Sequence, residues 1–430
     1  MERMKLMGIS VKTGLLMFLL VIIGVQDIQH ALTIETGDFL HYWTTAQFEM
    51  KRHPGSLYSL ESEGFLNDFS VEYSGGLCIH AVELMRGERP FVAMQSPFLY
   101  SMIGYLSTDD YDHDERIFHE ISFACLLAGL ALLIVRLDYG LDELLILAIF
   151  VLYAFFPVIQ DDVNSNVNRI EFFLLALSLL CLGTRAPFLQ AAGSALLGAA
   201  VMLKMNMLPI VPLLFLLALQ RKDVKRLRWQ GIGFLAGLFA AFMTGSMFMR
   251  SFSWVEWLQR VASRRLWENS LSDGNYSLPS LLFSLTGWDL SIPVLVIGLV
   301  LVAVRLRGSL RTSAVGDDRP PLHLEQLRLA AAGCLVWILC FPLVWSHYYT
   351  LTLPMVVYVL RPGFQSAAGA GKRLAAFTAI AALAMPLYLT GAGMSFAATG
   401  WMSWSAALVL FLLGTGTNRV VQDELVTTGL

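Results

Sequence analysis

Asp38 and Tyr42 lie in the first polar cluster that follows an apolar run. The cluster, residues 37–43, reads Gly-Asp-Phe-Leu-His-Tyr-Trp. On a helix Tyr42 would stand one turn after Asp38, on the same face. A carboxylate in a partly desolvated site beside aromatic rings is what a general base needs. The same pattern is also typical of a helix N-cap within an interfacial aromatic belt, so both interpretations stay open.

Lys204 and His347, which could bind an anion or donate a hydrogen bond, lie at the ends of later apolar runs. Lys204 interrupts residues 196–219. Placing an ammonium group in such a run costs a few kcal/mol, so it usually pairs, lines a cavity or extends to the membrane surface. His347 precedes Tyr348 in the sequence Trp-Ser-His-Tyr-Tyr of residues 345–349. This histidine can bind an anionic oxygen or shuttle a proton, although an aromatic girdle also contains structural histidines.

Residues 250–278 form an unusual stretch that is rich in Arg and Trp. Arg264 and Arg265 belong to it, and it ends in Asp-Gly-Asn-Tyr-Ser-Leu, which includes Asn275. The spacing predicts an amphipathic helix. Because a guanidinium group suits phosphate oxygens, these arginines indicate an anionic ligand, and a helix lying on anionic lipid headgroups is the alternative.

Two further polar segments precede apolar runs. Asn164 and Asn168 lie in residues 161–169, which could cap a helix or present amides to sugar hydroxyls. Residues 109–115 are acidic and permit a divalent cation, but their spacing matches no defined metal motif. We therefore assign no metal site and expect no required cofactor.

The composition predicts a membrane protein. Of the 430 residues, 56% are hydrophobic and only 15% are charged, and the mean hydropathy is +0.61. Soluble domains average about 25% charged residues. The net charge of -3 argues against nucleic-acid binding. The five cysteines form no CxxC pair, so we interpret them as core residues.

The apolar segments predict an all-α polytopic membrane protein with about 12 transmembrane helices in a single domain. The segments are residues 13–32, 119–136, 142–158, 170–184, 187–203, 207–220, 230–249, 290–305, 326–343, 348–360, 374–390 and 401–414. Several are shorter than the roughly 17 residues that a spanning helix needs, which predicts tilted or broken helices.

The distribution of Lys and Arg predicts the orientation in the cell (plasma) membrane. With both termini cytoplasmic, the short basic loops all fall inside, as membrane proteins prefer. This alternation requires residues 97–107 to form a short interfacial helix rather than a crossing. Residues 33–118 then form a long first extracytoplasmic loop, and residues 250–289 form a second. The candidate site residues gather on the extracytoplasmic side.

The order of these motifs resembles the glycosyltransferase C (GT-C) superfamily, and most closely glycosyltransferase family 87, the polyprenyl-phosphate-mannose-dependent alpha-mannosyltransferases of the phosphatidylinositol-mannoside type. The similar segments are residues 37–43, Pro-Gly-Ser-Leu-Tyr at 54–58, Ser-Pro-Phe-Leu at 96–99, Asn164 to Asn168, the Gly-rich run from Gly193 through Lys204 to Pro209, residues 273–278 and residues 345–349. Ser96 replaces a family proline, and Tyr348 stands where a second histidine is common.

The resemblance implies a GT-C fold and an inverting glycosyltransferase. Its donor would be a polyprenyl-phosphate-linked sugar, with mannose first and arabinose, a pentofuranose, second. Its acceptor would be an envelope glycolipid or glycan. Asp38 would be the catalytic base, and donor phosphate would meet Lys204, Arg264, Arg265 and His347. Sugar or acceptor would meet Tyr42, Asn164, Asn168, Asn275 and Tyr348. The alternatives are a transporter or flippase, which would place polar sites near mid-membrane, and a non-catalytic scaffold.

Overall fold

The computed structural model describes residues 11–31, 37–50, 57–58, 95–249 (without 109, 136 and 138), 253–262, 275–312 and 321–416 (without 387, 388 and 390–393). Within these ranges every regular element is a helix, and the only strand-like feature is an isolated antiparallel bridge between Asn275 and Trp345. The all-α prediction is therefore confirmed for this part of the chain.

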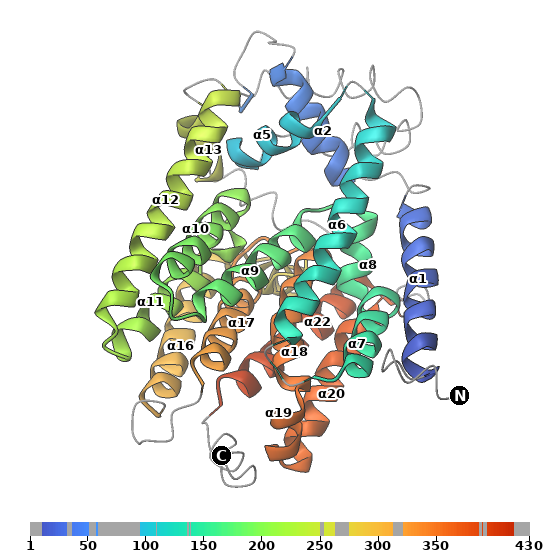
Figure 1. The fold of residues 1–430 in the computed structure, drawn as a ribbon, viewed down its shortest axis with the longest axis vertical. Helices are drawn as coiled ribbons and strands as arrows, with labels where there is room; N and C mark the ends of the chain where they lie inside the picture. Colours follow the sequence, from blue (N-terminus) through green and yellow to red (C-terminus); the bar gives the residue numbers. More distant parts are fainter. Residues whose placement is uncertain are drawn as a thin grey trace, which may run out of the picture.

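The helices form a bundle. The helices of residues 37–50, 97–106 and 253–261 form a cap at one end of it (Figure 1). In chain order, the helices are α1 (Val11–Ala31), α2 (Gly37–Met50), α5 (Pro97–Leu106), α6 (Tyr111–Ile134), α7 (Leu141–Tyr153), α8 (Phe156–Val163), α9 (Asn168–Leu182), α10 (Pro187–Leu203), the 3-10 helix η2 (Met205–Met207), α11 (Ile210–Gln220), α12 (Val224–Phe248), α13 (Ser253–Val261), α15 (Leu278–Thr286), α16 (Ser291–Thr312), α17 (Leu322–Cys340), the 3-10 helix η3 (Ser346–Thr352), α18 (Leu353–Leu360), α19 (Pro362–Ala367), α20 (Ala370–Ala384) and α22 (Phe396–Gly414).

Helices long enough to cross a bilayer are fewer than the sequence predicted. Among the described residues, 4 helices pass by length and apolar composition, namely α6, α12, α17 and α22. The pair α7 and α8 becomes a fifth if its 55° bend is counted as one broken span. The structure thus indicates a membrane protein, and about 12 crossings remain a prediction.

The break between α7 and α8 has a local cause. Pro157 occupies the first turn of α8 and has no backbone N–H to continue the hydrogen bonds of α7. The chain therefore bends, and α8 carries Asp161 and Asp162 to the turn that precedes α9.

Residues 97–106 form the short helix α5, and its interfacial position at the membrane stays a prediction. Ser96 caps α5 by accepting a hydrogen bond from the Leu99 N–H at 3.1 Å, and Pro97 starts the helix. With 10 residues α5 falls well below the roughly 20 that span a bilayer. It packs against α2 and α12 in the cap (Figure 1).

Small residues let α10 and α12 pack backbone to backbone. A Cβ atom at Gly233 or Gly237 would overlap the backbone of Ala191 or Ala195, and one at Gly198 would lie 2.7 Å from the Phe234 carbonyl oxygen. Such spacing of small residues is typical of helix contacts in membranes. The contact holds the end of α10, where Lys204 follows.

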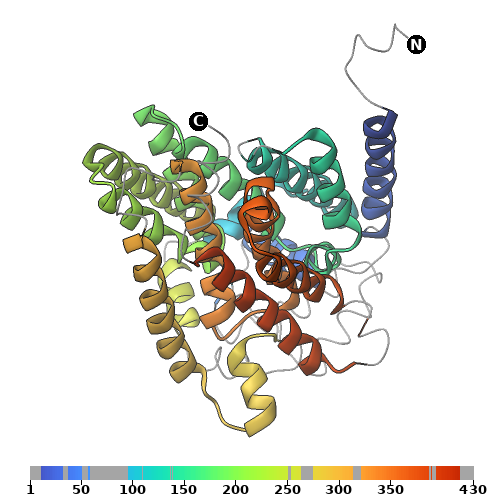
Figure 2. The same cartoon turned by 90° about the horizontal axis from the view of Figure 1, so that it is seen from below.

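Helices at the centre of the bundle are buried, whereas helices at its edge expose apolar side chains. Helix α17 is buried on nearly all sides, whereas α1 stands at the edge, packed on α7 (Figure 2). Leu15, Phe18 and Val21 of α1 are each more than 60% exposed. Exposed apolar side chains of this kind agree with a helix that faces lipid.

Candidate active site

Residues from four distant segments meet beneath the cap. Asp38 lies in the first turn of α2, and Lys204 follows α10. Asn166 lies in the turn between α8 and α9, Asn168 is the first residue of α9, and His347 lies in η3. Hydrogen bonds connect these segments directly. The sequence had placed these segments on one side of the membrane, and the structure brings them into contact.

Asp38 is the most accessible carboxylate of this cluster. Its backbone N–H donates to the Asn164 carbonyl oxygen at 3.1 Å, which fixes the start of α2. Its Oδ2 accepts a hydrogen bond from Asn166 Nδ2 at 2.6 Å and lies 3.7 Å from His347 Nε2. The Asp38 side chain is 35% exposed, whereas the Asp161 side chain is fully buried, so a substrate can reach Asp38 more readily.

Asn166 is the central residue that the sequence did not single out. Its Oδ1 accepts from Lys204 Nζ at 2.8 Å, and its Nδ2 faces both Asp38 and His347 Nε2, the latter at 3.2 Å. Because an ammonium group only donates, the amide orientation is defined by Lys204. Ser165, with a left-handed φ of 50°, turns the chain immediately before Asn166. The alternation of asparagines in residues 164–168 was the available signal.

Lys204 is a buried cation, 6% exposed. Its ammonium also donates to Asn168 Oδ1 at 3.1 Å and lies 3.9 Å from the centre of the Tyr348 ring. Burial lowers the pKa of Lys204, and the carboxylates of Glu171, Asp38 and Asp161 oppose this shift. The prediction that Lys204 pairs or lines a cavity is thus matched by its contacts, which include a cation–π contact.

The side chains of Asn168 and Asn275 form hydrogen bonds with protein groups that surround the site. Asn168 is fully buried, and its Nδ2 donates to Asp161 Oδ1 at 2.6 Å and to the His347 carbonyl oxygen at 3.3 Å. Asn275 Nδ2 donates to the Pro342 carbonyl oxygen at 2.7 Å, and its Oδ1 accepts from the Val344 N–H at 2.9 Å. Asn275 therefore supports the segment that leads into His347. The predicted contacts of both residues with a sugar stay predictions.

A buried ion cluster supports the Asn166 turn from behind. Arg169 Nη1 lies 2.6 Å from Asp162 Oδ1, and Arg169 Nη2 donates to the Val158 carbonyl oxygen at 2.9 Å. His119 Nε2 lies 2.9 Å from Ser165 Oγ. Since Arg169 is fully buried, these contacts fix the backbone that presents Asn166.

His347 is neutral in this environment. Burial lowers its pKa to about 3, with Lys204 adding to the shift and Asp38 opposing it. Because the Asn166 Nδ2 hydrogens face His347, the Nε2 atom acts as the acceptor and the proton resides on Nδ1. A neutral imidazole can orient Asn166, but it brings no positive charge to a phosphate.

Tyr42 and Tyr348, which are predicted to contact sugar or acceptor, differ in their surroundings. The Tyr42 hydroxyl is buried and has no hydrogen-bond partner among the described residues. Burial and the Asp38 carboxylate raise the pKa of Tyr42, which keeps its hydroxyl as a donor. An unpaired buried hydroxyl suits a substrate oxygen. Tyr348 instead lies against Lys204.

The remaining predicted residues are less central. The Asn164 side chain donates to the Gln160 carbonyl oxygen at 2.7 Å, within its own turn. Arg264 and Arg265 lie outside the described residues. Where the chain is described, no group of three His, Cys, Asp or Glu side chains could hold a metal ion.

The comparison with known families adds a decisive observation. The model of glycosyltransferase family 87 matches residues 96–342, which is more than half of the chain. The chain belongs to glycosyltransferase family 87. This family member is therefore a glycosyltransferase that needs a sugar donor and an acceptor. The match includes Asn166 and Lys204, and it begins after Asp38 and ends before His347. No curated protein and no solved structure matches the chain.

Proposed function

We propose that this glycosyltransferase moves a sugar, mannose by its resemblance, from a polyprenyl phosphate to a hydroxyl of an envelope glycolipid or glycan. The observation that carries the proposal is the bridge from Asp38 through Asn166 to Lys204. One amide group holds an accessible carboxylate and a buried ammonium in fixed relation. Group transfer from a phosphate needs these two functions, a base for the acceptor and a cation for the leaving group.

The transfer step balances with Asp38 as the general base. The acceptor oxygen attacks the anomeric carbon while its proton passes to an Asp38 carboxylate oxygen. The bond between the anomeric carbon and the phosphate oxygen breaks, and its electron pair leaves with polyprenyl phosphate. A single displacement inverts the anomeric carbon. Base catalysis of this kind typically contributes about 10² to 10⁴ in rate, or about 3 to 5 kcal/mol of barrier.

Lys204 is the proposed stabiliser of the departing phosphate. Its ammonium is held by Asn166 and Asn168 before substrate binds, so little reorganisation is needed when charge develops. Its burial strengthens the attraction, because water screens it poorly there. Arg264 and Arg265 are proposed as further phosphate ligands. His347 is proposed to hold Asn166 and Asp38 in place, and its direct contact with phosphate stays a prediction.

A lipid-linked donor agrees with the surroundings of the site. Asp38 follows α1, an apolar helix whose start lies at the opposite end of the bundle from the cap (Figure 1). The proposed location is therefore the extracytoplasmic membrane surface, where a lipid-linked donor presents its phosphate beside the bundle. The positive-inside distribution of Lys and Arg supports this orientation.

The donor can be tested directly. Purified protein in lipid nanodiscs would be given an envelope lipid fraction and one radiolabelled donor at a time: polyprenyl-phosphate mannose, polyprenyl-phosphate arabinose or a nucleotide-linked mannose. The proposal expects transfer from polyprenyl-phosphate mannose and none from the nucleotide sugar. Transfer from the arabinose donor alone would replace mannose by the pentofuranose. Transfer from the nucleotide sugar alone, or from no donor by folded protein, would contradict the proposal.

A further inference from the structure

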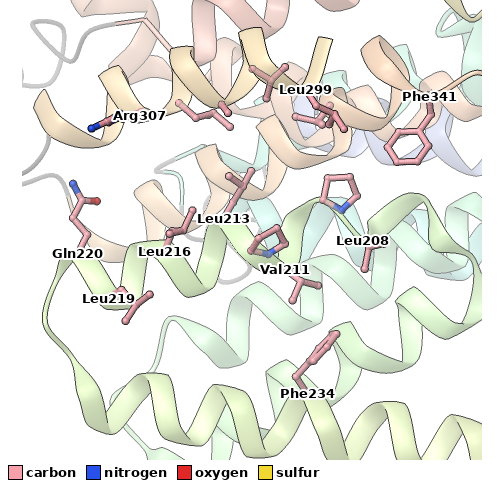
Figure 3. A pocket seen from close by; sticks show the side chains of 16 residues that line it. Leu208, Val211, Leu213, Leu216, Leu219, Gln220, Phe234, Leu299, Arg307 and Phe341 are labelled. Carbon is pink, nitrogen blue, oxygen red and sulfur yellow. The ribbon is translucent and has the colours of Figure 1, made fainter. Parts of the chain in front are cut away.

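An apolar groove lies on the side of the bundle between α11 and α16 (Figure 3). Its volume is about 960 Å³, close to the upper end of the range for ligand pockets. Its walls are almost entirely aliphatic and aromatic. Its lining includes Leu208, Gln220, Ala303, Arg307, Val336 and Phe341.

Helix α17 forms the floor of this groove. A Cβ atom at Gly333 of α17 would lie 2.8 Å from Ile210 Cα, where α11 starts. A Cβ atom at Gly298 of α16 would lie 2.9 Å from Cys340 Sγ of α17. Val336 lies between these two contacts along α17 and lines the groove. Helices α11 and α16, which form the walls, are thus both packed tightly against α17, and this packing defines the shape of the groove.

The two ends of the groove differ in polarity. Leu208 and Phe341 lie at one end, and Gln220 and Arg307 lie at the other (Figure 3). The Arg307 side chain is exposed and makes no hydrogen bond or ion pair with any described residue. Arg305, by contrast, donates to Thr415 Oγ1 and to the Leu412 carbonyl oxygen, both at 3.3 Å. Arg307 is therefore a cation that is available to a ligand.

The size of the groove matches one leaflet of a bilayer. Leu208 precedes α11 and Gln220 ends it, and the two are 12 residues apart, which corresponds to about 18 Å at about 1.5 Å per helical residue. Half of the hydrocarbon core of a bilayer measures about 15 Å. We propose that this groove binds an acyl chain of an anionic glycerophospholipid whose phosphate is held by Arg307. The aliphatic walls would cover the chain, and the guanidinium would bind the phosphate oxygens.

The position of Arg307 separates this lipid from the sugar donor. The described part of α16 runs toward the end of the bundle where α1 starts, whereas α2 and α5 occupy the opposite end (Figure 1). Donor phosphate is proposed to meet Lys204, only four residues before Leu208. A donor chain in the groove would therefore place its phosphate at the end lined by Leu208 and leave Arg307 unpaired. The exposed guanidinium favours a phospholipid from the other leaflet.

Native mass spectrometry of the detergent-purified chain would test the proposal. The protein would be offered phosphatidylglycerol or phosphatidylcholine with identical acyl chains. Both lipids carry a phosphate, but the choline cation of phosphatidylcholine cancels its charge, whereas phosphatidylglycerol is a net anion. We expect phosphatidylglycerol to be retained about fivefold better, the ratio that follows from about 1 kcal/mol per basic residue at an anionic lipid surface. Arg307→Gln should remove this preference, and Arg307→Lys should keep most of it. Ala303→Trp should reduce retention of both lipids, because the indole would fill the groove.

The control is Lys372→Gln, because Lys372 is an exposed cation on α20 that does not line the groove. This variant should retain lipid as the wild type does, and thermal unfolding would verify that each variant is folded. Equal retention of the two lipids by the wild type would overturn the proposal. It would also be overturned if Arg307→Gln kept the preference for phosphatidylglycerol. Equal displacement of phosphatidylglycerol by polyprenyl phosphate from the wild type and from Arg307→Gln would contradict it too, because the groove would then bind the donor chain without using Arg307.

Discussion

The side-chain amide of Asn166 joins Asp38 to Lys204. Its Nδ2 lies 2.6 Å from Asp38 Oδ2, and its Oδ1 lies 2.8 Å from Lys204 Nζ. The proposed base and the proposed phosphate ligand therefore share one rigid, hydrogen-bonded group. Moving Asn166 would misplace both at once, and small misplacements of reacting groups have large effects on rate.

Asn166→Ala should lower kcat by about 10²-fold, because Asp38 loses its orienting hydrogen bond and Lys204 loses an acceptor. Ser178→Ala is the control. Ser178 is a buried polar residue of α9, ten residues after Asn168, whose hydroxyl donates to the Gly193 carbonyl oxygen at 2.7 Å, and it belongs to no part of the proposed site. Transfer rates of both variants would be measured with polyprenyl-phosphate mannose. Equal losses in the two variants would argue against a positioning role for Asn166.

Lys204→Met should lower kcat by about 10²- to 10³-fold, the range typical for loss of one group that stabilises developing negative charge. The KM for the donor should rise much less, because the phosphate gains charge mainly as the bond breaks. Methionine keeps an unbranched apolar side chain like the stem of lysine and lacks the ammonium group. Steady-state kinetics would separate the two effects. A large rise in KM with unchanged kcat would show that Lys204 only binds the donor.

His347 should not appear in the pH dependence of transfer. Its pKa is lowered to about 3, below the usual value, so the imidazole is neutral above about pH 4 and protonation begins only at strongly acidic pH. His347→Gln should therefore lower the rate without changing the shape of the profile between about pH 5 and 8. Rate profiles of the two proteins provide the measurement. Loss of an ionisation near pH 6.5 in the variant would contradict the neutral assignment.

The contact between α10 and α12 should be sensitive to a single methyl group. Gly233→Ala places a Cβ atom against the backbone of Ala191, which cannot move without separating the helices. The variant should unfold at a lower temperature, with a typical overpacking loss of about 1 to 3 kcal/mol. Gly231→Ala is the control on the same helix, since its Cβ would meet only Phe215 at 3.8 Å. That variant should be unchanged or slightly more stable. Equal melting temperatures would count against the close packing.

Single residues of the site could be predicted from the sequence more readily than their partners. Asp38, Lys204 and His347 stand out because each is a polar group at the end of an apolar run. Asn166 does not stand out, because it is one of several asparagines in the same turn. Its importance arises from contacts between segments far apart in the chain, and no local pattern contains those contacts.

Helix positions followed the apolar pattern, but polar helix starts were harder to predict. The acidic residues 109–115 gave no sign of a helix in the sequence, whereas α6 begins at Tyr111. Asp110 caps this helix by accepting from the His113 N–H at 3.1 Å, and Asp114 accepts from Trp43 Nε1 at 2.9 Å. Acidic residues favour the first turn of a helix through its dipole. The cap and the hydrogen bond to Trp43 fix the start of α6.

The most direct test of the account is the transfer rate of Asp38→Asn with polyprenyl-phosphate mannose and a purified acceptor. Asparagine keeps the size of the side chain and its contact with Asn166 through an oxygen, but it cannot take up the acceptor proton. The account predicts a loss of about 10² to 10⁴ in kcat, with a melting temperature close to that of the wild type. Transfer by folded Asp38→Asn at the wild-type rate would contradict the assignment of Asp38 as the general base.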